Sequence, residues 1–168
     1  MHDMNHTRLF LFYPCLMISL FGCAQARVSV KHLYAVFQVH LPGNVAVDEN
    51  GREIAPRDTV RFVYIETAAR DIVWQTAWEN GKVYTVNAQL LDTGECNAGT
   101  FAKTNGTLLL HAAPGNRLWR LQLIASDQQR EAPKPLGRDQ ILLRGIFKGK
   151  VLWEKAANLG ELNAIPSQ

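Results

Sequence analysis

Residues 71–91, DIVWQTAWENGKVYTVNAQLL, carry the strongest indication of fold in this sequence. Segments rich in β-branched and aromatic residues, which favour strands, stand on both sides of the pair Asn80-Gly81. Asn-Gly supplies the positive φ values of a type I′ turn, which joins two antiparallel strands in a hairpin. Trp74 and Trp78 are also spaced as on one face of a helix, but no capping residue precedes them. The pattern therefore predicts two strands, at 71–78 and 82–91.

Alternation with a period of two, as in a half-buried strand, recurs along the rest of the chain. Near the middle, for example, Phe62 and Tyr64 fall on one face of an extended segment, and Val63 and Ile65 fall on the other. Further strands are expected at 31–40, 44–48, 59–66, 107–112, 117–125, 141–147 and 151–154.

These strands, about nine in all, are separated by turn residues and predict an all-β fold. The expected architecture is an antiparallel β-sandwich of about seven to nine strands. A closed barrel is the alternative, because the strand period does not separate the two. Residues 126–140 are polar and contain Pro133 and Pro135, which predicts a long exposed loop. Only residues 155–162 look helical.

The N-terminus has the pattern of a secretory signal peptide. Residues 9–22 form an apolar run of 14, shorter than the ~20 residues that span a bilayer. Cleavage after the A-x-A segment 24–26 would leave a soluble periplasmic or secreted protein that starts at Arg27. Alternatively, Leu20-Phe-Gly-Cys23 resembles the lipobox of bacterial lipoproteins, in which the cysteine is lipidated and becomes the new N-terminus.

We expect the lipobox to be used, with Cys23 as the lipidation site. The resemblance implies several acyl chains on one residue, and two or more chains anchor a protein stably to a membrane. Ala24 after the cysteine resembles an outer-membrane address, so we expect an outer membrane lipoprotein that faces the periplasm. The chain then divides into a signal peptide, a lipidated tether, a β-sandwich domain and a C-terminal tail, at 1–22, 23–30, 31–160 and 161–168.

The composition fits one globular domain. Removal of 22 residues from 168 leaves 146, enough for one domain and hardly for two. Hydrophobic residues make up 47 % of the chain and charged residues 20 %, which excludes a disordered polar chain. With 18 Lys+Arg and 15 Asp+Glu the formal charge is +3, too weak a bias to indicate a nucleic-acid partner.

Residue patterns that carry catalysis are sparse, so we expect a non-enzymatic protein with no metal or cofactor. Cys96 is the one cysteine that stays a free thiol in the lipidated form, and we expect it to be buried. The conceivable nucleophile and base are Cys96 and His111. The mature histidines, His32, His40 and His111, lack the close spacing of metal ligands, although two of them could meet across strands.

The segment 130–155 is basic, with seven positive and three negative residues. It could face an anionic partner such as lipid headgroups or an acidic protein surface. It could equally be a solvated edge strand whose lysines discourage pairing with other sheets. Because long loops on a rigid scaffold often carry binding residues, we place the contact surface on the loop at 126–140 and the following turn. The expected partner-binding residues are Arg130, Lys134, Arg138, Lys148 and Lys150.

Three stretches, 43–51, 55–63 and 80–86, resemble a transthyretin-like, or carboxypeptidase-regulatory-like, domain. The resemblance implies a sandwich fold and no particular activity. Small sandwich lipoproteins of this kind resemble assembly components of secretion or envelope machines, or immunity-type inhibitors of a toxic enzyme. The segment 132–136 (APKPL) is similar to the proline-rich loop of the transthyretin-like lipoprotein of type VI secretion systems.

The expected function is therefore to bind another protein in the periplasm. The alternative is a ligand- or carbohydrate-binding envelope protein, for which exposed tryptophans would be needed.

Overall fold

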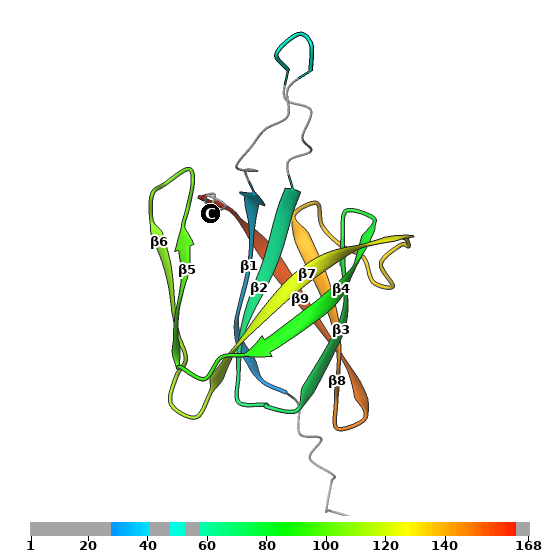
Figure 1. The fold of residues 1–168 in the computed structure, drawn as a ribbon. Helices are drawn as coiled ribbons and strands as arrows, with labels where there is room; N and C mark the ends of the chain where they lie inside the picture. The colour runs from blue at the N-terminus through cyan, green and yellow to red at the C-terminus, as the bar shows by residue number, and fades with distance from the viewer. Residues whose placement is uncertain (1–27, 41–47, 53–57, 164–168) are drawn as a thin grey trace, which may run out of the picture.

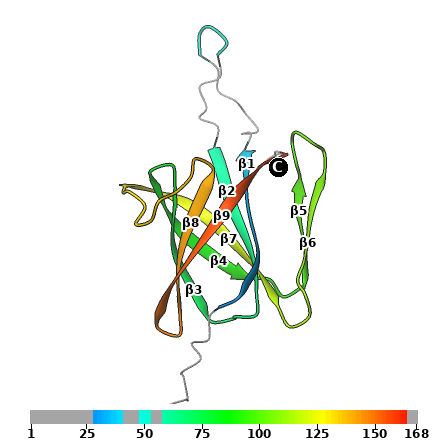
Figure 2. The same cartoon turned by 180° about the vertical axis from the view of Figure 1, so that it is seen from behind.

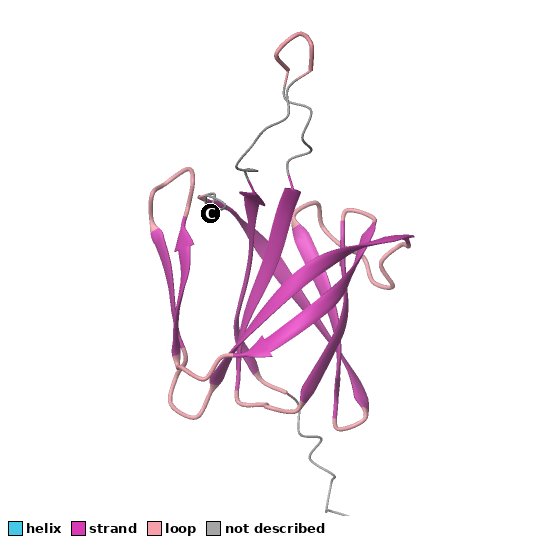
Figure 3. Cartoon of the chain, in the orientation of Figure 1, coloured by secondary structure: helices cyan, strands magenta, loops and turns pink. Residues whose placement is uncertain are grey.

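The computed structural model describes residues 28–40, 48–52 and 58–163. In these residues the secondary structure consists of strands without helices (Figure 3). The all-β class and the number of strands are thus confirmed. The strands are β1 (Val30–His40), β2 (Asp58–Thr67), β3 (Ile72–Glu79), β4 (Lys82–Leu90), β5 (Glu95–Thr100), β6 (Thr107–His111), β7 (Arg117–Gln129), β8 (Gln140–Phe147) and β9 (Lys150–Leu162).

Seven strands form one sheet that closes into a barrel, in the order β1-β2-β7-β4-β3-β8-β9. Closure comes from β1, which pairs antiparallel with β2 on one side and parallel with β9 on the other. The remaining two strands, β5 and β6, form a hairpin that stands beside the barrel next to β1 (Figures 1 and 2). The described molecule is therefore a β fold of two sheets, antiparallel except for the β1–β9 pair, and its larger sheet curls until its first and last strands pair.

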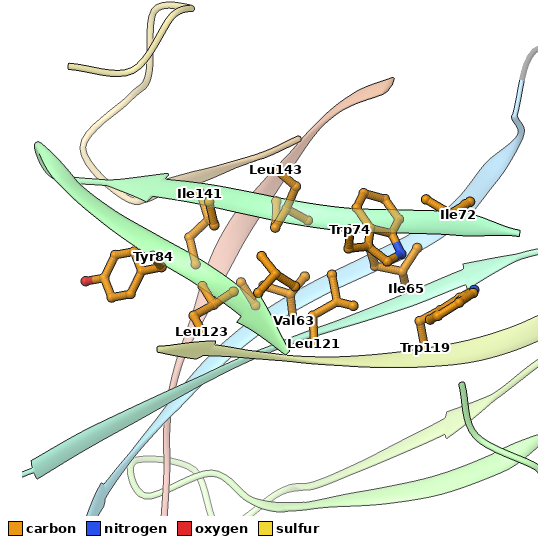
Figure 4. Packing of buried hydrophobic residues seen from close by; sticks show 14 residues of the cluster. Val63, Ile65, Ile72, Trp74, Tyr84, Trp119, Leu121, Leu123, Ile141 and Leu143 are labelled. Carbon is orange, nitrogen blue, oxygen red and sulfur yellow. The ribbon is translucent and has the colours of Figure 1, made fainter. Parts of the chain in front are cut away.

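The barrel interior holds the main hydrophobic core (Figure 4). On β2 the inward residues are Val63 and Ile65, which share one face as the alternation predicted. Gly145 on β8 lies opposite Trp74, and a Cβ atom there would come within 3.0 Å of the indole ring. The missing side chain therefore makes room for the large ring. The core is completed by aliphatic and aromatic residues of the six other barrel strands, among them Ile72, Tyr84, Trp119, Leu121, Leu123, Ile141 and Leu143.

A second apolar layer lies between the hairpin and the outer face of the barrel. Val36 and Tyr64 point outward from β1 and β2 and pack against Leu108 and Leu110 of β6. Burial raises the pKa of Tyr64 to about 12. This layer explains why β1 and β2 are apolar on both faces, since one face fills the barrel and the other is covered by the hairpin.

Glu66 fixes the turn that leads out of the hairpin. Its buried carboxylate accepts hydrogen bonds from the Ala113 amide at 2.9 Å and the Asn116 side chain at 2.6 Å. Burial acts to raise the pKa of this carboxyl, but the two hydrogen bonds and the nearby His32 outweigh burial, so the pKa lies below its usual value. The carboxylate therefore ties the start of β7 to β2.

Two predicted segments differ from the structure. Residues 126–129 belong to β7 and pair with β4 beyond a bulge, so the loop extends only over residues 130–139. Their side chains are mostly exposed, which removed the alternation that marks a strand. Residues 155–162 are not helical. They continue β9, which pairs with β8 and then with β1, and these pairings override the local helical pattern.

The set of strands also differs in one member. Strand β5 was not predicted, because Asn97 and Gly99 disfavour strands and only pairing with β6 holds the segment extended. The strand predicted at 44–48 lies almost entirely outside the described residues. The ordered barrel begins one residue before the predicted domain 31–160 and ends two residues after it.

The predicted hairpin at Asn80-Gly81 is confirmed, with φ values of 49° and 76°. Replacing Gly81 by Val would force a β-branched residue into the left-handed region. We expect Gly81→Val to lower the free energy of unfolding by about 1–2 kcal/mol, measured by chemical denaturation. Gly94→Val is the matched control. A Cβ at position 94 meets nothing within 4 Å, and the backbone there does not have a positive φ. Equal losses in the two variants would contradict the turn assignment.

Candidate functional site

The outer face of β4, β3, β8 and β9 carries two neighbouring rows of side chains. Residues directly opposite one another in paired strands lie on the same face of a sheet. Strand register therefore places Trp78 between Val83 and Leu142, with Lys155 next in line. Two residues further along each strand lies the second row: Thr85, Thr76, Arg144 and Trp153. The first row is mainly apolar and the second mainly polar.

The loop 130–139, which joins β7 to β8, folds over the first row (Figure 1). Its apolar residues Ala132 and Leu136 pack against a cluster formed by Trp78, Val83, Leu142 and Trp153. The Lys155 ammonium donates a hydrogen bond to the Pro135 carbonyl at 2.6 Å. The loop 130–139 is thus exposed, as predicted, at all of its residues except Ala132 and Leu136, and these two side chains anchor it to the barrel.

A cleft of about 510 Å³ lies beside this anchored loop. We call it the loop cleft. Its wall on the barrel side is the second row together with Trp78, Val83 and Tyr84. Its other walls are the end of β7 and loop residues such as Arg130 and Glu131. The rings of Trp78 and Trp153 meet in its wall with centroids 5.8 Å apart. The cleft thus combines an aromatic floor with charged and hydroxyl-bearing side chains.

Charge in and around the loop cleft is predominantly positive. Arg144 donates a hydrogen bond of 2.5 Å to the Gln75 side chain, which fixes its guanidinium on the barrel wall. Lys134 holds its ammonium 5.1 Å from the centroid of the Trp153 ring, a cation–π contact. Burial raises the pKa of the neighbouring Glu154, and the Lys134 charge opposes this rise.

One residue of this wall has a polar atom that is closed to solvent and lacks a partner. Trp78 is 6 % exposed, and its indole Nε1 has no hydrogen-bond acceptor among the described residues. Buried donors without acceptors are rare, since each costs about 1–3 kcal/mol. Trp74 shares this property, but it lies in the barrel core away from the loop cleft.

The predicted partner-binding residues divide between two ends of the barrel. Arg130, Lys134 and Arg138 lie on the loop that precedes β8, whereas Lys148 and Lys150 lie at the turn that follows it (Figure 1). Eight residues of β8 separate the groups, about 26 Å at ~3.3 Å per residue. The first three therefore share one loop, on which Arg130 lines the loop cleft and Lys134 contacts Trp153, and the two lysines lie apart from them. The predicted lipidation site, Cys23, lies outside the described residues.

The residues considered for catalysis or metal binding do not assemble into a site. Register places His111 opposite Glu95, with 3.2 Å between Nδ1 and Oε1, while Cys96 lies opposite Leu110 and faces the barrel. Cys96 is half-buried, and burial raises the pKa of its thiol. His32 and His111 line one cavity of about 230 Å³. Among the described residues, His, Cys, Asp and Glu form no group of three or more that could hold a metal ion.

Sequence reasoning did not place Trp78, Arg144 and Trp153 in one site. A signal was present at the hairpin, where Trp78 and Val83 flank the turn and both fall on the face opposite the core residues Ala77 and Tyr84. Apolar residues on both faces of a hairpin indicate that something covers its outer face. The local sequence of the hairpin does not indicate which distant segment covers this face.

No protein-family model matches this sequence, and neither does any curated protein or solved structure. The lipobox and the transthyretin-like resemblance therefore stay predictions. The described part of the chain contains no helix long and apolar enough to cross a membrane.

Anchoring of the loop by Leu136 leads to a direct test. Leu136→Ser should release the loop, so that trypsin cleaves faster after Arg130 and Arg138. Removing one partly buried leucine should lower the free energy of unfolding by only about 1 kcal/mol. Asp139→Ser, at an exposed position of the same loop, is the control. Limited proteolysis measures the rate of cleavage. A rate unchanged in the Leu136 variant would show that the loop does not depend on this contact.

Proposed function

We propose that this chain is a non-enzymatic, periplasm-facing outer membrane lipoprotein that binds another protein at the loop cleft. The observation that carries the proposal is a cleft wall that brings Trp78 and the half-buried Trp153 together with Arg130 and Arg144. Tryptophan and arginine are among the residues most enriched at energetically dominant positions of protein interfaces.

The architecture around the cleft supports a binding role. The second row lies on paired strands of the barrel, so its side chains hold their positions before a partner arrives. Preorganisation of this kind reduces the entropy lost on binding. The anchored loop adds exposed charge at the rim, from Arg130, Lys134 and Arg138. Together these features favour a partner with an acidic surface, because opposite potentials accelerate encounter.

Two biological roles fit a protein-binding lipoprotein of this size. One is an assembly component of a secretion or envelope machine, and the other is an immunity-type inhibitor of a toxic enzyme. The surrounding genes distinguish them, since a neighbouring toxin gene would support inhibition and a secretion cluster would support assembly.

A carbohydrate or small-ligand site is the second candidate. It is favoured by the half-buried Trp153 together with the hydroxyl groups of Thr76, Thr85 and Ser126, which line the same cleft. Sugars bind through aromatic stacking and hydroxyl hydrogen bonds. Quenching or shifting of tryptophan fluorescence by glycans, lost in Trp153→Ala, would support this candidate over protein binding.

Charge reversal at the loop tests the protein-binding proposal. A photoreactive residue at Thr85 would capture a bound partner in intact cells. Arg130→Glu combined with Arg138→Glu should slow association about tenfold at low ionic strength, because exposed rim charges act mainly on encounter. Arg52→Glu with Lys103→Glu makes the same change of charge at exposed residues outside the loop cleft and its rim and should leave capture intact. Equal capture by both variants would place the site elsewhere.

Lipidation of Cys23 is tested separately. Cys23→Ser should stall processing or release the protein from the membrane fraction, because the acyl chains attach to the cysteine. Cys96→Ser is the control and should fractionate like the unchanged protein. Membrane fractionation and the mass of the mature N-terminus report the outcome. Processing of the Cys23 variant to Arg27 with unchanged membrane retention would contradict the lipoprotein proposal.

A further inference from the structure

Three aliphatic side chains, two exposed and a half-buried one between them, form a row at the end of the barrel away from the loop cleft. Val73 lies opposite Ile146, which in turn lies opposite Val151, so the three are neighbours across β3, β8 and β9. They point outward, because the residues beside them, Ile72 and Leu152, pack in the barrel core. Val73 and Val151 are 60 % and 50 % exposed. We call this set the aliphatic row.

Each residue of the aliphatic row stands next to the end of its strand. Val73 and Val151 are the second residues of β3 and β9, and Ile146 is the last but one of β8. The row therefore lies at the rim of the barrel (Figure 2). Neither the β5–β6 hairpin nor the loop 130–139 covers it, since their apolar contacts lie in two other clusters.

Two exposed lysines border this row. Lys148 and Lys150 flank Gly149 in the tight turn between β8 and β9, where Lys148 and Gly149 both have positive φ. The Lys148 ammonium lies 5.2 Å from the centroid of the Phe147 ring. Just before β3, Arg70 and Asp71 carry opposite charges and offset one another. The rim beside the aliphatic row is therefore positive.

The start of the described chain lies at this same end. Because β1 and β9 are parallel, Val30 and Lys150, their first residues, lie toward the same end of the barrel. The described chain begins at Val28, and Cys23 stands five residues before it in the sequence. Five residues reach at most about 18 Å when fully extended. A lipid on Cys23 would therefore hold this end of the barrel within about 18 Å of the bilayer.

We propose that the aliphatic row, with Lys148 and Lys150, docks this end of the barrel onto the surface of an anionic phospholipid bilayer. The inference rests on the lipoprotein part of the proposed function, because the tether selects which end faces the membrane. Exposed aliphatic groups bordered by lysines suit the boundary between headgroups and acyl chains. Docking at this end turns the loop 130–139 away from the membrane, where a periplasmic partner can reach it.

The test uses protein made from the full-length gene and reconstituted into vesicles. Each variant carries Cys96→Ser and one new cysteine for a fluorophore, either Val151→Cys in the aliphatic row or Leu109→Cys on β6. Leu109 is the matched control because it is aliphatic and 53 % exposed. Vesicles of phosphatidylcholine with brominated acyl chains, with or without phosphatidylglycerol, quench a fluorophore that reaches the bilayer.

We expect the label at position 151 to be quenched more strongly than the label at 109, and only with phosphatidylglycerol at low salt. Lys148→Glu with Lys150→Glu should lower the docking constant about fivefold for each lysine. Equal quenching at the two positions would overturn the proposal. Quenching at position 151 that is the same with and without phosphatidylglycerol would also overturn it. The protein mass reports Cys23 lipidation independently, so failure of the lipoprotein proposal is recognised separately. If Cys23 is not lipidated, flotation of the unlipidated protein with anionic vesicles tests docking. Flotation that is lost in the lysine variant would then support the docking proposal.

Discussion

Parallel pairing between β1 and β9 is the interaction on which the rest of this structure depends. It joins residues 35–38 to residues 158–162 and turns an open, twisted sheet into a barrel without free edges. Closure defines an inside, and the inward side chains of all seven strands become one core. Closure also fixes the orientation of each strand's outer face around that core. The positions of the surface features therefore depend on the β1–β9 pairing.

Apolar groups lie on the outer face of the barrel in three places, and they differ in what covers them. Next to β1 the outward side chains are apolar and the β5–β6 hairpin covers them. At the β3–β4 turn a smaller apolar group is covered by the loop 130–139, through Ala132 and Leu136. At the opposite rim the aliphatic row stays exposed. Ordering a segment of chain over an apolar group costs conformational entropy. An apolar group that stays exposed at a rim is therefore a candidate contact surface.

This arrangement gives the molecule two unlike ends. One end carries the loop cleft, with paired tryptophans and two arginines. The other carries the aliphatic row, the lysine turn and the start of the described chain. Eight residues of β8 connect them, so one rigid strand links the proposed partner site to the proposed membrane surface. A lipoprotein that presents a binding site to the periplasm needs such a polarity.

Most strands, the division of their residues between two faces and the Asn80-Gly81 hairpin could be predicted from the sequence, because φ preferences and a period of two are local properties. Strand β5 and the true course of 155–162 could not, since pairing with distant strands outweighs weak local preference there. The basic residues of 130–150 were recognisable as charged, but only the fold separates Arg130 and Arg138 from Lys148 and Lys150. Trp78, Arg144 and Trp153 become neighbours because register aligns three strands, and no local pattern specifies which strands pair.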